Sequence, residues 1–414
     1  MKEPTADLAG IDLASPEAAA DPYRAMTPLR EADDGVHWNE PFGGWVIARY
    51  DDVRDALHDW ERLSSDRISP YYEARLEGPK RDLYLPTYEI LRRWMVFVDP
   101  PDHKRLRTLV DHAFKPRTLD AQEPRIAALI DELLDPLAGS VDWVSSFAYL
   151  LPVLVISDFL GVPAADRHLI KGWSDTILQL IFGDYTVPDR HERAREAFVA
   201  FGDYLRGHVA DRRKRPGDDL ISELVRARED DDALTEDEVV ATCVLLLFGG
   251  HETTTNLLAN GLLALLRHPE QMARYRAEGD ALGKWPVEEL LRYDGPSKAA
   301  PRVVRVDHDR GGRRLRAGEK VLILQCAANR DPRQFDAPDR LDLGRRPNPH
   351  LTFGYGIHYC IGAPLARVEG RLAFPRLFER FREVELDQEA PPPAFSPTIL
   401  SRSLRRLPVR LTPR

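Results

Sequence analysis

Long stretches with helical periodicity and a few short stretches with strand periodicity alternate along this chain of 414 residues. Helical patterns cover 21–33, 51–60 and 102–114 and recur through the middle of the chain. Strand-like segments lie within 36–50, on either side of a Gly-Gly turn, and within 303–324, around a second Gly-Gly turn. Helix therefore dominates, and we expect a mainly α protein with small β-sheets.

Two stretches lack a clear period. Leu63–Val98 is predicted to be a long loop, and it holds several aromatic residues, among them Tyr71 and Tyr72. Such a loop often carries binding function, but aromatic side chains can also simply pack a loop down, and the residues leave both interpretations open. Asn329–His350 is rich in proline and is predicted to be irregular.

Leu234–His268 is predicted to be one long helix, which at 1.5 Å per residue would run about 50 Å. Thr235 and Glu238 form a capping box at its start. Two adjacent glycines in the middle of the helix, followed by threonines that can bond back to the preceding turn, weaken it there. We expect a local opening of functional importance at that point.

Composition narrows the class of protein. Hydrophobic residues make up 43% of the chain, charged residues 30%, and the formal net charge is −9, which favours a soluble protein and argues against nucleic-acid binding. Three cysteines without a C-x-x-C pair fit a reducing cytoplasm. The N-terminus has no apolar signal segment, and no stretch is long and apolar enough for a membrane anchor. We expect one domain over 1–414, with an N-terminal arm of about 20 residues.

The chemistry centres on Leu351–Arg367, which reads LTFGYGIHYCIGAPLAR. Gly354 and Gly356 permit tight turns with positive φ, which can hold a loop under a flat cofactor. Cys360 lies just before a predicted helix with Pro364 in its first turn. The free N–H groups and the dipole at a helix N-terminus favour the thiolate, the form of cysteine that binds metals. A buried cysteine in a glycine-rich turn is the structural alternative.

The series F-G-x-G-x-H-x-C-x-G in this stretch resembles the cysteine-ligand loop of the cytochromes P-450, the haem-thiolate monooxygenases. The resemblance implies the cytochrome P-450 fold, with a long central helix over haem b and Cys360 as the axial ligand of the haem iron. It places four further loop residues against the cofactor: Phe353, Gly354, His358 and Gly362. The resemblance covers most of the chain from about Asp21, and without a membrane anchor it indicates the soluble bacterial type.

Phe248–Thr255, in the middle of the long helix, resembles the oxygen-binding stretch of the same family. By that match Thr253 is the alcohol and Glu252 the acid that deliver protons during O₂ activation. A hydroxyl and a carboxylate joined by water form a plausible proton relay. Gly249 and Gly250 would leave room for dioxygen and substrate above the porphyrin.

Glu289 and Arg292 form an E-x-x-R pair three positions apart on a predicted helix, Pro286–Tyr293, so they can pair on one face. In order with the other motifs, they resemble the buried structural pair of the family, which braces the stretch before the cysteine loop. His103 and Arg107 stand four apart on another helix. The resemblance assigns four residues to the haem propionates: His103, Arg107, Arg302 and His358.

The resemblance also indicates where a substrate would lie. The pocket candidates are largely apolar, aromatic or small: Tyr71, Tyr72, Leu178, Ile181, Leu247, Gly250, Ala299, Ala300 and Ile399. A hydrophobic small molecule is therefore expected, with terpenoid, aromatic, fatty-acid and polyketide substrates all open. Lys298 departs from the family, which commonly has an uncharged residue thereabouts. We expect its side chain to point to solvent, with contact to an anionic or polar substrate group as the alternative.

No G-x-G-x-x-G follows a strand, so electrons must come from a separate protein, by resemblance a ferredoxin with its ferredoxin reductase. Four arginines near the loop form a candidate basic patch for an acidic partner, with ordinary surface arginines as the equal alternative: Arg345, Arg346, Arg367 and Arg371. Two other functions stay open, a peroxide-driven haem-thiolate peroxygenase and a haem-binding sensor without turnover. A proton relay argues against both.

Overall fold

The structure, a computed structural model, describes residues 8–32, 34–114, 122–182, 188–229 and 232–414. It divides into two compact units. Unit 1 comprises Met1–Ser64, Ala127–Leu151 and Thr253–Arg414, and unit 2 comprises Ser65–Ile126 and Pro152–Glu252. Three helices have residues in both units: α8 (Glu123–Leu134), α9 (Leu150–Leu160) and α13 (Glu236–Arg267).

Unit 1 combines helices with all but two of the named strands. Its elements are α1 (Pro16–Ala20), α2 (Pro22–Glu31), β1 (Val36–Asn39), β2 (Gly44–Ile47), α3 (Tyr50–His58), β3 (Leu63–Ser64), β4 (Gly139–Asp142), η2 (Val144–Ala148), α14 (Pro269–Leu282), α15 (Trp285–Asp294), β7 (Ala300–Val304), β8 (His308–Arg310), β9 (Arg313–Leu315), β10 (Lys320–Ile323), α16 (Gln325–Ala328), η4 (Gly356–His358), α17 (Ala363–Arg380), β11 (Phe381–Leu386), β12 (Ala394–Phe395), β13 (Leu404–Arg406) and β14 (Pro408–Pro413).

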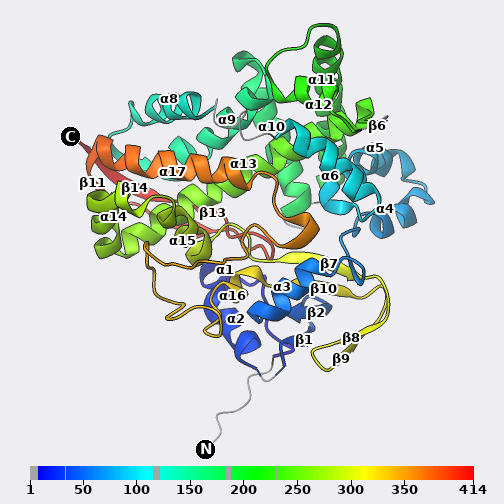
Figure 1. Cartoon of the computed structure of the whole chain (residues 1–414), viewed down its shortest axis with the longest axis horizontal. Coiled ribbons are helices and arrows are strands. Elements are labelled where there is room, and N and C mark those ends of the chain that lie inside the picture. Colours follow the sequence, from blue (N-terminus) through cyan, green and yellow to red (C-terminus); the bar gives the residue numbers. More distant parts are fainter. Residues whose placement is uncertain (1–7, 33, 115–121, 183–187, 230–231) are drawn as a thin grey trace, which may run out of the picture. The chain divides into compact units, whose positions relative to one another are not determined.

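Strands from both ends of the chain build a five-stranded sheet in the order β1-β2-β10-β7-β3. In Figure 1 the yellow strands β7 and β10 lie beside the blue strands β1 and β2. β10 pairs in parallel with β2, with Val321 opposite Trp45, and antiparallel with β7. Both predicted strand regions are confirmed, including the turn at Gly311 and Gly312, which both have positive φ. The sheet holds β7, which carries Arg302, in place. After β10 the chain continues directly into α16.

Unit 2 is almost entirely helical. Its elements are α4 (Ser69–Leu76), α5 (Arg81–Leu91), η1 (Met95–Phe97), α6 (Asp102–Ala113), η3 (Ala164–Asp166), α10 (Arg167–Phe182), α11 (Arg190–Lys214), α12 (Leu220–Arg226), β5 (Arg228–Glu229) and β6 (Asp232–Ala233). Aromatic side chains join its helices: Trp173 of α10 stacks on Phe201 of α11 with ring centroids 5.1 Å apart. The predicted helix 102–114 is confirmed as α6.

The long helix is confirmed as α13, which spans 32 residues. Its capping box is confirmed as well: the Thr235 N–H donates to Glu238 over 2.8 Å, and the Glu238 N–H donates to Thr235 Oγ1 over 3.3 Å. The helix runs unbroken through Gly249 and Gly250, so the predicted opening is not a break in the helix. Packing of its apolar flanks holds the weak stretch in helical form.

The prediction of a loop over Leu63–Val98 is wrong, because most of this stretch is helical in α4, α5 and η1. Pro86 lies inside α5 and obscured its period. Tyr72 stacks on Tyr88 at 5.7 Å and meets Tyr84 edge-on at 6.1 Å, so aromatic packing between α4 and α5 stabilises helices that local propensity leaves marginal.

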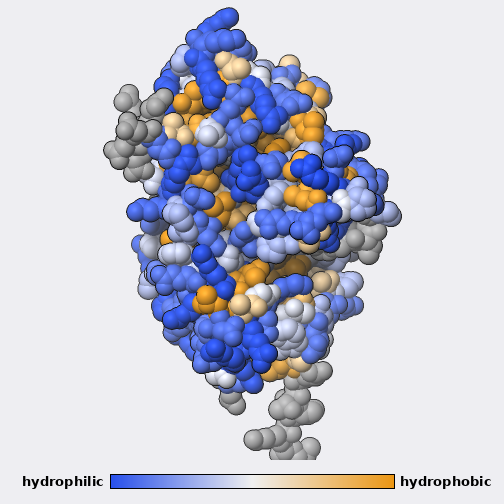
Figure 2. Space-filling model, turned by 90° about the vertical axis from the view of Figure 1, so that its right-hand side faces the viewer, coloured by the Kyte–Doolittle hydropathy of each residue, from blue (hydrophilic) through white to orange (hydrophobic). Residues whose placement is uncertain are grey.

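Hydrophilic residues cover most of the face shown in Figure 2, and hydrophobic side chains lie between them in small groups. Among the described residues, no helix has the length and apolar character required to cross a membrane.

Candidate functional site

The cysteine loop has the backbone geometry that its glycines predict. Gly354 has φ 77° and Gly356 has φ 74°. A Cβ atom on Gly356 would lie 3.0 Å from the Cα atom of His58, so the loop also needs glycine there for space. The Cys360 N–H donates to the carbonyl of Phe353 over 2.9 Å and closes the loop. Cys360 is exposed, unlike Cys243 and Cys326, so the alternative of a buried structural cysteine does not hold.

The helix that follows the loop begins as the sequence predicts. Gly362 is the N-cap of α17, and a proline occupies the first turn. A Cβ atom on Gly362 would lie 3.9 Å from Cys360 Sγ, so the thiol lies against the start of this helix. The free N–H groups there favour a thiolate at Cys360.

Side-chain amides and a hydroxyl fasten the start of the loop. Asn329 Oδ1 accepts from the Leu351 N–H over 2.7 Å, and Gln325 Nε2 donates to the Leu351 carbonyl over 2.7 Å. Thr352 Oγ1 accepts from Asn329 Nδ2 and donates to the Leu291 carbonyl. The sequence analysis missed Gln325, Asn329 and Thr352, because isolated polar residues give no local signal of their distant backbone partners.

Glu289 and Arg292 form a fully buried ion pair, with both side chains 0% exposed and Arg292 Nε 2.8 Å from Glu289 Oε2. Arg292 also donates to the carbonyls of Asn329 and Pro338, each over 2.8 Å. Arg345 Nε lies 3.3 Å from the same carboxylate. The pair therefore holds the irregular stretch before the cysteine loop through its backbone.

Arg345 is consequently not a surface arginine. Its side chain is 12% exposed, and its guanidinium donates to the carbonyls of Asp336 and Ala337 as well as to Glu289. Its inclusion in the candidate basic patch is wrong, because its charge is used inside the molecule. Arg346 is exposed, and its guanidinium lies 5.1 Å from the ring centroid of Trp285.

A second acidic residue, Glu288, connects the cysteine loop to α17. Arg367 Nε lies 2.6 Å from Glu288 Oε1 and Arg367 Nη2 lies 3.0 Å from Oε2. His350 Nε2 approaches Oε2 to 3.0 Å. Burial opposes ionisation of Glu288, but the hydrogen bonds from His350 and Arg367 prevail and lower its pKa to about 2. The sequence analysis missed Glu288 and His350, whose roles depend on contacts between separate segments.

The middle of α13 is accessible, although the helix is buried on both sides of it. Thr253 is exposed and Glu252 half-buried, whereas Leu247 is 1% and Thr254 is 2% exposed. Among the described atoms, a Cβ on Gly249 would meet nothing within 4 Å. Burial lowers the pKa of the neighbouring His251 to about 4, which keeps it neutral at pH 7. Glu252 and Thr253 thus lie on the accessible part of an otherwise packed helix.

The four propionate candidates lie on three elements, and two of them share a helix. His103 and Arg107 are both on α6 in unit 2, with His103 buried and Arg107 Nε 3.0 Å from Asp111. In unit 1, Arg302 is on β7, where its Nη1 donates to the Pro301 carbonyl over 2.9 Å, and His358 ends η4.

Three of the candidates for the substrate pocket have packing contacts, and the other six lie on several separate elements. Tyr71 Oη lies 3.2 Å from His191 Nε2, and Tyr72 is 3% exposed within the tyrosine cluster, so both tyrosines have packing roles. Ala299 belongs to a core cluster with Leu13 and Met26, so its methyl group packs in the protein core. The remaining candidates lie on α10, on α13, on β7 and before β13: Leu178, Ile181, Leu247, Gly250, Ala300 and Ile399.

Lys298 does not point to solvent, and the expectation that it would is wrong, since the residue is 1% exposed. Its backbone is held on both sides: the Lys298 N–H donates to the Leu400 carbonyl, and the Lys298 carbonyl accepts from the Cys326 N–H. Burial lowers the pKa of Lys298 to about 8, with Arg402 lowering it further and Cys326 and Asp294 opposing.

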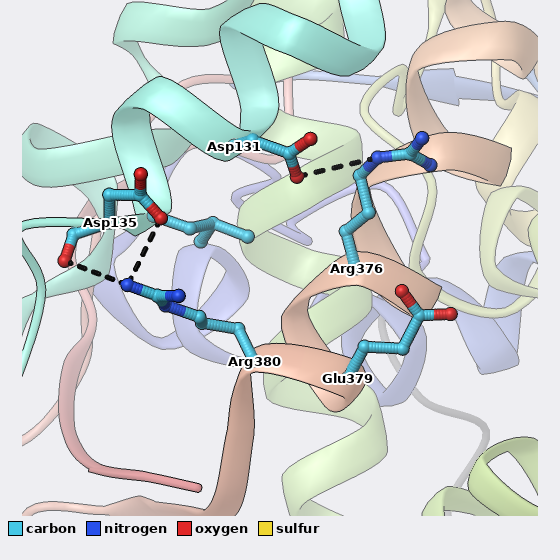
Figure 3. Close-up of a pocket in the computed structure, with 6 residues that line it drawn as sticks. Asp131, Asp135, Arg376, Glu379 and Arg380 are labelled. Atoms are coloured by element: carbon cyan, nitrogen blue, oxygen red, sulfur yellow. Dashed lines mark hydrogen bonds and ion pairs between the residues drawn. The ribbon is translucent and has the colours of Figure 1, made fainter.

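A shallow groove on unit 1 is lined by charged residues of α8 and α17 and the residue after α8 (Figure 3). Arg376 lies 3.5 Å from Asp131, and Arg380 lies 3.0 Å from Asp135. These ion pairs join α17 to the end of α8 across the surface, and five of the six residues that line the groove are charged. We assign it a structural role.

The described residues fit a haem bound through a thiolate. Cys360 is an exposed thiol at a helix start, in a loop whose glycines allow a close flat approach. A helix with an accessible Gly-Gly stretch and an acid–alcohol pair is present in the same chain. Both features are of the kind that a haem bound through a thiolate requires.

Known proteins match this chain over nearly its whole length. The sequence model of the family described as Cytochrome P450 matches residues 184–410. Cytochrome P450 CYP107DY1 of Priestia megaterium is 37% identical over 418 residues, covering 99% of this chain and 100% of that relative. The 6-deoxyerythronolide B hydroxylase of Saccharopolyspora erythraea is 38% identical over 410 residues, covering 97% of this chain and 98% of that relative.

A solved structure shares the fold over the same extent. P450BioI, in complex with an acyl carrier protein ligated to hexadec-9Z-enoic acid, superposes with a TM-score of 0.87 at 35% identity. The match covers 96% of this chain and 100% of that structure's chain. The predicted fold class is confirmed.

Replacement of Lys298 by methionine should stabilise the protein at neutral pH. Below about pH 8 the folded chain holds a buried ammonium that the unfolded chain would solvate. Between pH 8 and the usual pKa of 10.5 the unfolded state binds more protons, so the stability of the wild type rises with pH and then levels off. Lys298→Met should raise the free energy of unfolding at pH 7 by about 1–3 kcal/mol and remove this slope.

Urea denaturation from pH 7 to 10.5 measures both effects. Lys320→Met, at an exposed position on β10, is the matched control and should leave stability within about 0.5 kcal/mol. A destabilised Lys298→Met protein at pH 7 would show that the ammonium has a compensating partner.

Proposed function

Because the chain belongs to the cytochrome P450 family and is a monooxygenase that binds haem b, we propose that it inserts one oxygen atom of O₂ into a hydrophobic small organic molecule, by hydroxylation or a related oxidation. The observation that carries this proposal is the exposed Cys360 in its closed, glycine-rich loop at the start of α17. Haem bound there supplies O₂ activation and oxygen transfer.

We assign the binding of the haem iron and of the propionates to individual residues of this chain. Cys360 is the proposed axial ligand of the haem iron, with Phe353, Gly354 and Gly362 shaping the loop around it. Four cations or hydrogen-bond donors are proposed partners of the propionates, since buried carboxylates require such partners: His103, Arg107, Arg302 and His358. Gly249 and Gly250 are the proposed residues of α13 nearest the cofactor: a Cβ on Gly249 would meet nothing within 4 Å, and a Cβ on Gly250 would lie 3.5 Å from Ile156.

Glu252 and Thr253 are the proposed catalytic pair. They are adjacent on the accessible stretch of α13, where the Thr253 hydroxyl can donate a proton from Oγ1 and the Glu252 carboxyl can replace it through water. This role favours an enzyme driven by O₂ and electrons over a peroxygenase, which needs no proton relay, and over a sensor, which needs no turnover.

We propose that the whole chain acts as a single cytochrome P450 domain. Both units are discontinuous in sequence, and α13 contributes residues to each, so neither is a separable module. The three free cysteines favour a reducing compartment, which in a bacterial cell is the cytoplasm.

The substrate class is inferred from relatives and from the candidate lining. One relative is named for the hydroxylation of 6-deoxyerythronolide B, and P450BioI is solved with an acyl carrier protein bearing hexadec-9Z-enoic acid. In this chain Leu178, Ile181, Leu247 and Ile399 are apolar, which favours a hydrophobic substrate of unspecified skeleton.

Electrons are proposed to come from a ferredoxin and its reductase. Arg346 and Arg371 are the exposed members of the candidate basic patch, since Arg345 is bound to Glu289 and Arg367 to Glu288. These two exposed arginines are the residues that we propose an acidic ferredoxin would contact.

Ligation by Cys360 can be tested by absorption spectroscopy. The reduced protein under carbon monoxide should show a strongly red-shifted Soret band, and Cys360→Ser should lose it, because serine cannot supply a thiolate. Cys243→Ala, which changes a buried thiol in α13, should keep the band. Haem-replete wild-type protein without the band would contradict the central assignment.

The proton relay predicts uncoupling. Thr253→Ala should still consume electrons and O₂, but product formed per electron pair should fall by about tenfold or more, with peroxide appearing instead. Thr254→Ala, which changes the adjacent buried threonine, should remain coupled. Full product formation by Thr253→Ala, in reactions driven by electrons and by added peroxide alike, would favour the peroxygenase.

The ferredoxin surface predicts a charge effect on rate. Arg346→Glu combined with Arg371→Glu should slow reduction by a ferredoxin roughly tenfold at low ionic strength and flatten the salt dependence. Arg314→Glu, an exposed arginine of β9 with 54% side-chain exposure, is the control reversal. Equal stopped-flow rates in all three proteins would remove the patch from the proposal.

A further inference from the structure

Glu288 stands at the centre of a hydrogen-bonded chain that ends at the residue before Cys360. Arg367 binds its carboxylate through two nitrogen atoms, at 2.6 and 3.0 Å, and Arg367 Nη1 donates to Tyr359 Oη over 3.1 Å. The Arg367 guanidinium also lies 4.5 Å from the ring centroid of Phe353. One cation therefore contacts residues at both ends of the loop segment that the bond from the Cys360 N–H to the Phe353 carbonyl closes.

His350 also contacts the Glu288 carboxylate, and its hydrogen bonds determine which ring nitrogen carries the proton. The Thr352 N–H donates to His350 Nδ1 over 3.3 Å, so Nδ1 is an acceptor and the proton is on Nε2, facing Glu288. Burial lowers the pKa of His350, which is therefore neutral at pH 7. The group contains one anion, Glu288, and one cation, Arg367, and its net charge is zero.

Because the group of Glu288, His350 and Arg367 has no net charge, Arg367 differs from an arginine that binds a partner protein through its free charge. Its side chain is 32% exposed, but its charge is compensated by a carboxylate that is 9% exposed. A bidentate arginine–carboxylate pair has fixed geometry, which suits it to hold a loop in place. A partner protein approaching this pair would meet little net charge.

We propose that Glu288 and Arg367 are a charge-compensated positioning pair, which holds the loop of Cys360 and sets the electrostatic potential, and thereby the reduction potential, of the haem iron bound there. This inference rests on the proposed function, in that Cys360 must be the ligand. Protein charges and hydrogen bonds near a ligating sulfur tune the potential of the metal without touching it. Neither residue is assigned to proton delivery or to substrate binding.

The test is a double-mutant cycle read out as the ferric–ferrous midpoint potential. Glu288→Gln leaves an extra positive charge, which favours the ferrous state, so the midpoint should rise. Arg367→Gln leaves an extra negative charge, so the midpoint should fall. Each shift should correspond to roughly threefold to tenfold in the reduction equilibrium, the size expected of one uncompensated charge that solvent partly screens; tenfold is about 59 mV for one electron. The double variant should return close to the wild-type potential.

Two further variants separate charge from structure. Arg367→Lys keeps the charge and should keep the wild-type potential. Arg376→Gln changes another arginine of α17 and breaks its ion pair with Asp131 of α8, and it should leave the potential unchanged. Thermal melting of each haem-loaded protein checks that it folds. Shifts of the same sign in both single variants, or no shift in either, would overturn the inference.

Failure of the proposed function looks different from failure of this inference. If Cys360 is not the ligand, the wild type itself lacks the red-shifted band. If only the inference fails, wild type and Arg376→Gln both show the band while Glu288→Gln has the wild-type potential.

Discussion

The buried pair of Glu289 and Arg292 is the constraint on which the candidate site depends. Both side chains are fully buried, and together they bind backbone carbonyls and an N–H from a stretch with neither helix nor strand, between Asn329 and Arg345. Desolvating two charges makes such a pair weak evidence for stability, but loss of one partner would leave the other charged and buried. The irregular stretch therefore keeps its course only while the pair is intact. Asn329, whose carbonyl Arg292 binds, in turn holds Leu351 at the start of the cysteine loop.

Two adjacent residues of α15, Glu288 and Glu289, hold different parts of the cysteine loop and its flanks. Glu289 faces the stretch before the loop, whereas Glu288 faces His350 and Arg367, on either side of the loop. Consecutive residues on a helix point in directions about 100° apart, so they cannot serve the same partner. A single turn of helix thus fixes both the entry to the loop and the helix that leaves it, which makes the placement of Cys360 sensitive to small movements of α15.

Interactions between neighbouring residues made the cysteine loop and the ends of several helices predictable from the sequence. Positive φ at Gly354 and Gly356, proline in the first turn of α17 and the Thr235–Glu238 cap all arise from neighbouring residues, and all are present. The stretch from Leu63 to Val98 was mispredicted because packing between α4 and α5 overrides a proline inside the helix. Arg345 was misplaced for a similar reason: its carboxylate partner is 56 residues away along the chain. Contacts between distant segments, which have no local signature, account for the errors and for the missed Glu288, His350 and Asn329.

Lys298 and Arg292 show why burial of a cation does not by itself indicate function. Both are 1% exposed, yet Arg292 has a carboxylate and three backbone carbonyls within hydrogen-bond distance. Among the described residues no carboxylate forms an ion pair with Lys298, and Asp294 instead accepts from Tyr23 and Arg402. Burial opposes the charge of both residues, and only Arg292 has partners that compensate for it. The partners of a buried charge decide its role, and by that criterion the pairs Glu289–Arg292 and Glu288–Arg367 are built to hold the loop, whereas Lys298 is a charge retained at a cost to stability.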